Sequence, residues 1–496
     1  MKPVGTITVC FPYVDEKTRS TLEVVMDKAE NYSDFTEKLC DRVISESSSP
    51  VMEYLAFLFA YKIENYNLID RLEVAGKVSD LARPLLLFTK IDRGASIKWG
   101  EMKESLMSAL SAAPNDWIAS HLYLTWRLIT VGFFTEADTE VRSLDVISAA
   151  VKENSEMQYF ELYLLRIAAA RFEKDNLRRE EIAHLRQALA IARKFNDGVT
   201  VASILMKLAG LTKHTDLQKA IDMTVTAKIL GEELGSESLI GLVQHQMGHI
   251  MGMRGEYDAA AEYQCEYKAN QEALGRSAPM INAMISLYYN LSGNGEKALK
   301  FAGEVFTPEE APHTLLPYAR AQQAWALINL GRYTEAEKAI EILQKHVLKS
   351  GDSMQMIWYN IIEGLFDKAE ERFENAVINF KKALDSNAEN IILLFQNICL
   401  LNLTEMEIDT LTDTSLHENH DSSGPWMKKL EGHVQEYDIP GVAAQSMILK
   451  AKLRYRQGKY DDVRKILKDV RDVAKNPSMR YLNDIIITKF PDVIVT

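Results

Sequence analysis

Two pairs of histidines have the spacing of metal ligands. His245 and His249 are one turn apart in a stretch whose pattern predicts a helix, so both rings would project from one helix face. His417 and His420 belong to an acidic His-Glu-Asn-His-Asp segment that could also chelate a metal ion. No third ligand accompanies His245 and His249 in the sequence. We therefore expect these two histidines to line a groove or to be partly buried, and we predict no metal site.

The motifs of common enzyme classes are missing from the sequence. No G-x-x-x-x-G-K-[ST] phosphate loop, G-x-S-x-G nucleophile elbow or H-E-x-x-H zinc motif occurs. The glycines at Gly293 and Gly295 follow no predicted strand, so they do not form a dinucleotide-binding loop. We therefore predict no catalytic residue and no cofactor, and we expect that the protein is not an enzyme.

Large aromatic side chains form the third chemically interesting group, because they can anchor a protein partner. Tyr163, Tyr318, Trp325 and Trp358 lie in stretches with helical periodicity. Aromatic residues at helical spacing usually belong to the core. A binding role requires that they face an accessible surface, which depends on how the helices are arranged.

The composition predicts an acidic protein that folds. Of its 496 residues, 47% are hydrophobic and 26% are charged, with a net charge of −13 and a pI of about 5.4. The negative charge disfavours direct binding to nucleic acid or to an anionic membrane. No apolar run has the length of a membrane span, and no signal peptide or C-x-x-C pair is found. We expect a reduced, cytoplasmic protein.

Helical periodicity extends over most of the chain. Residues 4–11 alternate apolar and polar side chains, which predicts a short strand, and helices are expected at about 15–31, 33–47, 50–63 and 64–75. A Gly-x-aromatic-x-x-Ala pattern then recurs, with Gly132, Gly255 and Gly331 as its glycines, a Val463 variant after Gly458, and degenerate copies at Gly293 and Glu371. Each copy predicts two helices joined by a tight turn, in which glycine adopts a left-handed conformation and alanine leaves room for the facing helix.

The spacing of these patterns predicts a repeat protein. Ala220, Ala260, Ala298, Ala336 and Ala376 follow one another at intervals of 38 to 40 residues. A chain of this length is too long for a single globular core, whereas a solenoid of repeats that contact only their neighbours has no such limit.

The stretch from Trp358 to Ala388 resembles a tetratricopeptide (TPR) repeat. Gly364 and Ala376 are small enough to let two helices approach, and Phe373 and Phe380 fill the space between them. The usual repeat has roughly 34 residues, so these repeats are about one helical turn longer. In this they resemble the TPR superhelices of MalT-like regulators and of scaffold proteins. The resemblance implies an all-α fold, a right-handed superhelical solenoid of helix hairpins.

The repeats also suggest a division of the chain. We expect the solenoid to span residues 77–475, after an N-terminal cap or divergent helical region at 1–76 and before a C-terminal cap at 476–496. Residues 405–423 are polar and acidic, and we expect an insertion that forms a mobile loop.

In the TPR family, residues of the first helices face the concave groove. On this register the candidate peptide-binding residues are Tyr163, Arg166, His245, His249, Met280, Tyr318, Trp325 and Trp358. Family members that hold a terminal carboxylate use a clamp of Lys, Asn and Arg. The corresponding positions here hold Tyr318, Ala321 and Trp325 in one repeat and Trp358, Ile361 and Leu365 in the next. The resemblance therefore implies an apolar groove without that clamp.

These observations predict a scaffold or peptide-binding adaptor with a protein or peptide partner. The first alternative is a regulator or sensor of the MalT-like type, which would bind a small effector or peptide and act through a separate ATPase or DNA-binding chain. A closed pocket would favour that alternative. The second alternative, an enzyme on an α-solenoid, requires a cluster of titratable groups that the sequence does not reveal. The oligomeric state stays open, with a homodimer among the alternatives.

Overall fold

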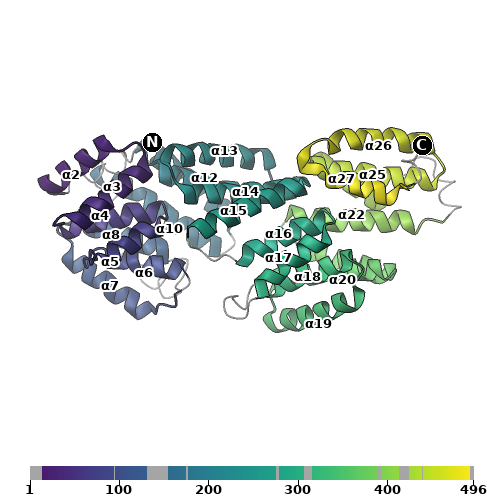
Figure 1. Ribbon diagram of the computed structural model, residues 1–496, viewed down its shortest axis with the longest axis horizontal. Coiled ribbons are helices and arrows are strands. Elements are labelled where there is room, and N and C mark those ends of the chain that lie inside the picture. Colours follow the sequence, from purple (N-terminus) through teal and green to yellow (C-terminus); the bar gives the residue numbers. More distant parts are fainter. Residues whose placement is uncertain are drawn as a thin grey trace. The chain divides into compact units, whose positions relative to one another are not determined.

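The computed structural model describes residues 14–93, 95–130, 155–174, 177–274, 279–306, 316–387, 392–412, 424–437 and 439–491. Every regular element within these ranges is helical, which confirms the all-α prediction (Figure 1). None of the described helices is both long enough and apolar enough to cross a membrane. The strand expected at 4–11, the pattern at Gly132 and the pair His417 and His420 lie outside the described ranges.

The helices of the described ranges follow one another along the chain. The earlier ones are α2 (Glu16–Lys28), α3 (Tyr32–Ser45), α4 (Pro50–Lys62), α5 (Tyr66–Val74), α6 (Arg83–Asp92), α7 (Trp99–Ala112), α8 (Asp116–Thr130), η3 (Ser155–Phe160), α10 (Glu161–Lys174), α11 (Arg178–Lys194), α12 (Gly198–Thr212) and α13 (Leu217–Leu234). The later ones are α14 (Glu237–Arg254), α15 (Tyr257–Ala273), α16 (Pro279–Leu291), α17 (Gly295–Gly303), η4 (Glu304–Phe306), α18 (Leu316–Asn329), α19 (Tyr333–Ser350), α20 (Ser353–Ala369), α21 (Phe373–Asn387), α22 (Leu393–Asp409), α24 (Pro425–Tyr437), α25 (Pro440–Arg456), α26 (Tyr460–Ala474), η5 (Pro477–Met479) and α27 (Tyr481–Lys489). The four helices expected near the N-terminus are present as α2 to α5.

The chain forms two compact units. The first comprises Met1–Thr212, Lys219–Val243 and Asn270–Arg276, and the second comprises Lys213–Gln218, Gln244–Ala269 and Ser277–Thr496. The division between these units falls in the region of α13 to α15.

Buried polar contacts explain why the N-terminal helices belong to a larger unit. The Tyr54 hydroxyl of α4 lies 3.2 Å from Nδ1 of His121 in α8. Lys62, also in α4, forms an ion pair of 3.1 Å with the buried Asp197, which accepts a further hydrogen bond from the Tyr159 hydroxyl at 2.8 Å. These contacts join α4 to residues that follow the expected boundary at 76, and the division into a cap or divergent helical region and a solenoid stays a prediction.

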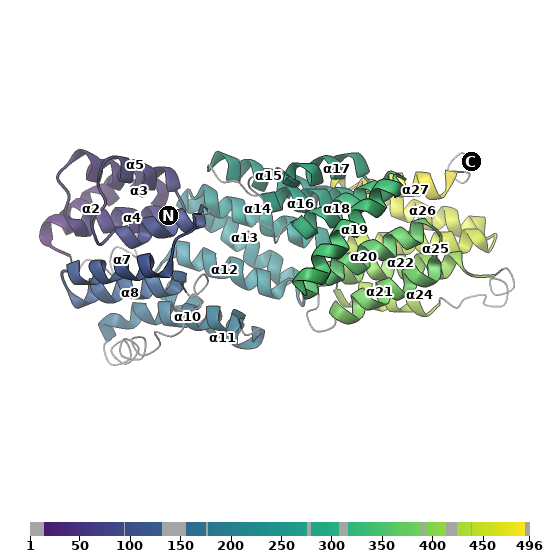
Figure 2. The same cartoon turned by 90° about the horizontal axis from the view of Figure 1, so that it is seen from below.

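First helices of successive repeats lie next to one another in the second unit. Helix α16 contacts α18, α18 contacts α20, α20 contacts α22, and α22 contacts α25, as can be followed in Figure 2. The second helices α17, α19, α21 and α26 each pair with the first helix that precedes them. This neighbour-to-neighbour packing is that of a helical repeat protein.

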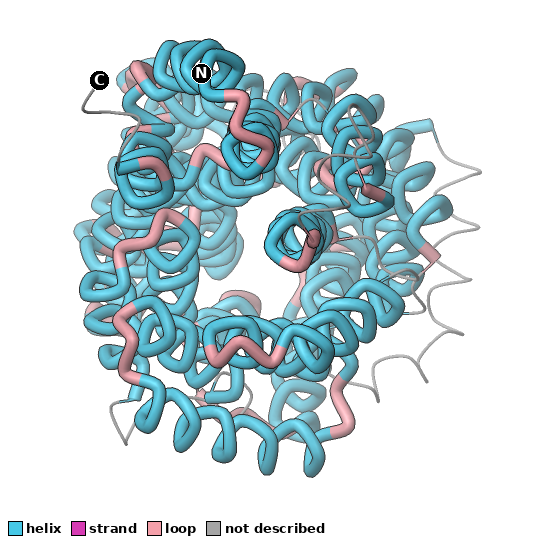
Figure 3. The backbone as a smooth tube through the Cα atoms, turned by 90° about the vertical axis from the view of Figure 1, so that its right-hand side faces the viewer, coloured by secondary structure: helices cyan, strands magenta, loops and turns pink. Residues whose placement is uncertain are grey.

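Tight turns join the helices of each pair, and Figure 3 shows only helices and loops along the described chain. Positive φ angles occur at Gly255 (79°), Gly293 (79°), Gly331 (70°), Gly458 (70°) and Glu371 (58°). In each case the next residue donates its N–H to the carbonyl oxygen five residues earlier, as Arg332 does to Leu327. This is the hydrogen bond of a Schellman cap, which favours glycine because a side chain disfavours positive φ. The prediction that these glycines end the first helices is confirmed.

Small residues allow the paired helices to approach closely. Ala220, Ala260, Ala298, Ala336, Ala376 and Val463 are all fully buried. A Cβ atom on Gly364 of α20 would lie 3.0 Å from the Phe380 ring of α21. The role that the repeat pattern assigns to these small residues is therefore confirmed.

The first residues of the expected insertion are helical. We expected a mobile insertion at about 405–423, and of these residues 405–409 belong to α22. The Glu407 carboxylate on this helix accepts hydrogen bonds from the backbone N–H groups of Trp426 and Met427, at 3.2 and 3.1 Å. It therefore caps the start of α24. Acidic side chains in this segment have specific partners, which composition alone does not reveal. Residues 413–423 lie outside the described part of the chain.

Candidate functional site

Four first helices of the second unit, α16, α18, α20 and α22, line two cavities. Residues toward their N-terminal ends line a cavity of about 570 Å³, which we call the apolar cavity, and residues toward their C-terminal ends line one of about 380 Å³, which we call the charged cavity. On α18, Tyr318 lines the apolar cavity and Trp325 lines the charged cavity. On α22, Phe395 lines the apolar cavity and Asn402 lines the charged cavity. Members of each pair are two helical turns apart, so they share a helix face and are separated by about 10 Å. We call this shared face the inner wall.

Methionine and aromatic side chains dominate the apolar cavity. They are Met253, Met280, Met284, Met354, Tyr288, Tyr318, Trp358 and Phe395. The Trp358 ring centroid lies 5.3 Å from that of Tyr318 and 4.8 Å from that of Phe395, both in edge-to-face geometry. Met280 and Met354 are 41% and 38% exposed. A rigid aromatic row therefore stands beside flexible thioether side chains, which can adapt to different apolar groups.

The two histidines of α14 belong to a chain of hydrogen bonds at the edge of the apolar cavity. Nε2 of His249 lies 3.1 Å from Nε2 of His245, whose Nδ1 lies 2.9 Å from Oε1 of Gln264. The Gln264 amide donates to the His245 carbonyl at 3.0 Å, which fixes its orientation. The Tyr288 hydroxyl lies 3.4 Å from Nδ1 of His249. Gly252 permits this approach, because a Cβ there would lie 2.3 Å from the Tyr288 ring.

The donors and acceptors of this chain are all satisfied with neutral histidines. Since Oε1 of Gln264 can only accept, His245 donates from Nδ1, and in a neutral ring its Nε2 then accepts from His249. Nδ1 of His249 then accepts from Tyr288. Burial lowers the pKa of both histidines, most strongly that of His249, which favours the same neutral state. The paired Nε2 atoms thus bind each other, and among the described residues no group of three or more His, Cys, Asp and Glu side chains is placed to hold a metal ion.

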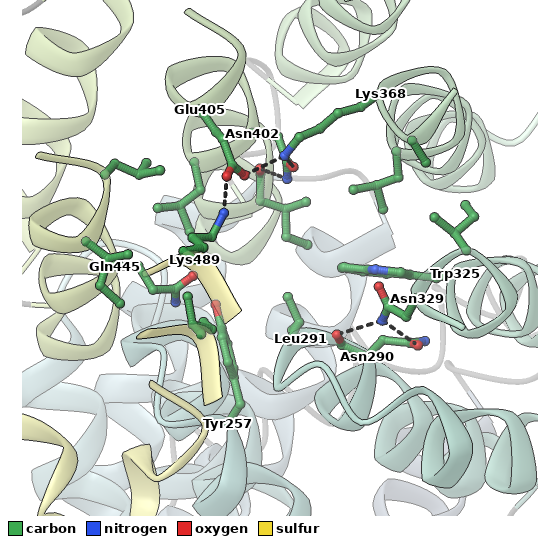
Figure 4. Close-up of a pocket in the computed structure, with 18 residues that line it drawn as sticks. Tyr257, Asn290, Leu291, Trp325, Asn329, Lys368, Asn402, Glu405, Gln445 and Lys489 are labelled. Carbon is green, nitrogen blue, oxygen red and sulfur yellow. Dashed lines mark hydrogen bonds and ion pairs between the residues drawn. The ribbon is translucent and has the colours of Figure 1, made fainter. Parts of the chain in front are cut away.

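The charged cavity contains a polar ladder along the inner wall. Asn290, Asn329, Lys368 and Glu405 occupy successive first helices, near their C-terminal ends (Figure 4). Nδ2 of Asn329 donates to the Asn290 carbonyl at 3.1 Å, and Nζ of Lys368 donates to Oε2 of Glu405 at 2.6 Å. The partners are 39 and 37 residues apart, which is one repeat. The repeat therefore places a polar side chain at the same height on each helix.

Glu405 is the central anion of the charged cavity. Its carboxylate forms ion pairs with Nζ of Lys368 at 2.6 Å, with Nζ of Lys452 at 3.0 Å and with Nζ of Lys489. Lys368 and Lys489 are drawn in Figure 4. Burial by itself raises the pKa of Glu405, but the three ammonium groups outweigh burial and hold that pKa well below its usual range. Lys452 also pairs with Asp409 at 2.7 Å. In this cluster three lysines thus share two carboxylates.

Contacts between distant segments close the second unit around the charged cavity. The Tyr481 hydroxyl of α27 donates to the Gly255 carbonyl at 2.7 Å, and its backbone N–H donates to Asp258 at 3.2 Å. The backbones of Gly441 and Gly255 touch, since a Cβ on Gly441 would lie 2.2 Å from the Gly255 oxygen. Helix α27 also lines the cavity with Lys489. The C-terminal helices therefore form part of the wall of the charged cavity.

The structure gathers half of the candidate groove residues in one place. His249, Met280, Tyr318 and Trp358 line the apolar cavity. His245 does not line this cavity but is hydrogen-bonded to His249, which does. Trp325 lines the charged cavity. Trp325 and Trp358 are each 5% exposed, so both are packed in the wall that they line.

The other two candidates lie in the first unit. Tyr163 is buried, and its hydroxyl lies 3.1 Å from Nε2 of His121. Arg166 lines a separate cavity of about 210 Å³, together with Glu181 and Lys207. Tyr163 therefore serves the core of the first unit, and neither residue is brought to the two cavities of the inner wall.

Sequence reasoning missed Phe395, Lys368, Glu405 and Lys489. The repeat period carries a signal for the first three, because Phe395 lies one repeat after Trp358 and the partners Lys368 and Glu405 are also one repeat apart. Lys489 has no such signal, since it reaches the cavity only through the return of α27.

Neither the models of known protein families nor the curated proteins match this sequence. The geometry of the second unit is therefore the basis on which its function is inferred.

Proposed function

We propose that the protein is a peptide-binding adaptor or scaffold whose second unit holds an apolar peptide segment against the inner wall. The supporting observation is the apolar cavity, in which methionine and aromatic side chains from successive repeats converge and two methionines stay exposed. Clustered exposed apolar side chains are typical of surfaces that a partner covers. Methionine adapts to varied side chains, and the packed aromatic row gives the two exposed methionines a rigid backing.

We further propose that the repeats are of the TPR type and wind into a right-handed superhelix. This proposal is supported by the recurring Schellman turns, the buried small residues and the neighbour-to-neighbour packing of hairpins. The acidic composition supports a cytoplasmic protein that contacts other proteins rather than nucleic acid or membranes.

A regulator that binds a small effector is the second candidate. The contacts at Gly255, Gly441 and Tyr481 support it, because they bring helices from distant parts of the second unit to the wall of the charged cavity. A regulator of this kind would act through a separate chain that carries an ATPase or DNA-binding activity.

Selection from a phage-displayed library of random dodecapeptides on the full-length protein tests the adaptor proposal. We expect enriched peptides with apolar residues, and Met280→Ala should weaken their binding about fivefold to tenfold, as loss of an interface anchor costs about 1 kcal/mol or more. Ile378→Ala is the matched control, because Ile378 on α21 is 50% exposed and does not line the cavity. An absence of enriched peptides, or equal losses in both variants, would contradict the proposal. Stabilisation by small metabolites in the absence of peptide binding would favour the second candidate.

A further inference from the structure

We infer that the charged cavity is a second subsite of the same peptide site and takes an acidic side chain. The second unit would then select peptides with an apolar anchor and an aspartate or glutamate about three to five positions away. This inference rests on the proposed function and adds to it the charge and the spacing of the ligand.

The first argument is the charge balance of the cavity. Among the described residues that line it, the acidic and basic side chains are Lys368, Lys489 and Glu405, so its wall carries an excess of one positive charge. Including Lys452 and Asp409 leaves the same excess. The three lysine side chains are partly buried, at 21–28% exposed, so an additional carboxylate in the cavity would be favourable.

The state of Lys489 supports this argument. Burial lowers the pKa of Lys489, and the charges of Lys368 and Lys452 lower it further, although Glu405 acts in the opposite direction. Lys452 has a second carboxylate partner in Asp409 and Lys368 also donates to Asn402, whereas the acceptor that the described residues give Lys489 is Glu405. A ligand carboxylate beside it would form a charge-assisted hydrogen bond with a donor that is already held in place.

The second argument is the surroundings of the lysines. Asn402, which accepts a hydrogen bond of 2.7 Å from Lys368, lines the same cavity as Asn329 and Gln445. These side-chain amides can bind the backbone of an extended peptide, since each carries both donors and acceptors. Trp325 forms an apolar side of the cavity (Figure 4). The cavity therefore combines groups for a carboxylate with groups for the chain that carries it.

The third argument is the distance between the two cavities. Tyr318 and Trp325 are two turns apart on α18, which corresponds to about 10 Å, and Trp358 and Lys368 on α20 are separated by about 15 Å. An extended peptide advances about 3.3 Å per residue. A single peptide that places an apolar side chain beside Trp358 therefore brings a residue about three to five positions away to the lysines.

The peptides enriched from the dodecapeptide library on the full-length protein provide the probe. Library peptides have no free C-terminus, so an acidic preference must come from side chains. We expect an acidic residue about three to five positions from an apolar one, and a labelled synthetic peptide should bind about tenfold more tightly than its Glu→Gln counterpart. Apolar peptides without this acidic preference would overturn the inference and leave the proposed function standing, whereas an absence of enriched peptides would overturn both.

A double-mutant cycle locates the acidic preference. In the Lys489→Gln variant, we expect the Glu-containing peptide to bind only about twofold more tightly than its Gln counterpart, whereas the wild-type protein should prefer it about tenfold. We call this preference the Glu-to-Gln ratio. Lys475→Gln is the matched control, since the Lys475 side chain is 79% exposed, pairs with Asp472 and lies outside both cavities. An unchanged ratio in the Lys489 variant, or an equal fall in the control, overturns the inference.

Two further measurements on the wild-type protein keep the inference testable if the Lys489 variant does not fold. The Glu-to-Gln ratio should decrease as the salt concentration rises, because the preference is electrostatic, and a ratio independent of salt would refute the assignment. Glutarate alone should not displace the labelled peptide at millimolar concentration. Displacement by glutarate as efficient as that by the unlabelled peptide would assign the cavity to small anions instead.

Discussion

Closure of the second unit can be tested at the contact between Gly441 and Gly255. The substitution Gly441→Ala adds one methyl group at the start of α25. That methyl carbon would lie 2.2 Å from the Gly255 carbonyl oxygen and 2.4 Å from its carbonyl carbon, whereas ordinary contacts lie at 3.4–4 Å. Both atoms are backbone atoms and cannot rotate away. The two segments must therefore separate by about 1 Å before the methyl group fits.

The expected loss of stability combines three contributions. Overpacking of this kind costs about 1–3 kcal/mol. Separation of the segments also weakens the hydrogen bond from Tyr481 to Gly255, which is worth about 1 kcal/mol. The gain in helix propensity from glycine to alanine offsets about 0.5–1 kcal/mol. We therefore expect Gly441→Ala to destabilise the protein by about 1–3 kcal/mol.

Gly432→Ala is the matched control for this substitution. Gly432 lies in α24, and a Cβ there would meet no atom within 4 Å, so we expect a small gain in stability. Urea unfolding gives the stability of both variants, and hydrogen exchange reports on α27. Gly441→Ala should speed the exchange of α27 amides, since this helix is held by Tyr481. Equal unfolding midpoints for the two variants, with α27 equally protected, would refute the closed arrangement of the second unit.

Three further predictions concern packing, charge and pH. Ala376→Leu should destabilise the protein by about 1–3 kcal/mol in urea unfolding, because Ala376 is fully buried between paired helices. Glu405→Gln should cost about 3–5 kcal/mol in the same assay, because its lysine partners lose their shared carboxylate. His433 donates from Nε2 to Asn397 at 2.7 Å, and burial lowers its pKa to about 4. Since its unfolded pKa is about 6.5, the unfolded chain binds the proton first, and stability should fall by roughly 3 kcal/mol between pH 6.5 and 4. His433→Gln should flatten that part of a pH-stability profile, and an unchanged slope would contradict the assignment.

The repeat architecture could be predicted from the sequence because its signals are local. Left-handed glycines such as Gly331 end helices through bonds within one turn, and a fully buried alanine such as Ala336 reflects contact within one hairpin. Part of the apolar cavity could be predicted from the sequence for a similar reason. Residues one repeat apart become neighbours when first helices pack side by side, which brought Tyr318 and Trp358 together.

The charged cavity and the closure could not be predicted in this way. The hydrogen bond between Tyr481 and Gly255 joins residues 226 positions apart, and no repeat period connects them. Glu405 was assigned to an acidic loop because its composition suggested solvent exposure, whereas its lysine partners come from three other helices. Tyr163 was placed in the groove by register alone, but the buried His121 provides a hydrogen-bond partner in the core of the first unit.

Site-specific photocrosslinking tests most directly whether a peptide lies on the inner wall. Benzoylphenylalanine is introduced in place of Met280 or Met354, which are exposed in the apolar cavity, or in place of Ile378 or Leu348, which are exposed outside it. Each variant is irradiated with a biotinylated peptide from the library selection, and the crosslinked products are mapped by mass spectrometry. We predict crosslinks from positions 280 and 354 that excess unlabelled peptide abolishes, and none from positions 378 and 348. Crosslinks from 378 or 348 alone would place the peptide on another surface and contradict the proposed function.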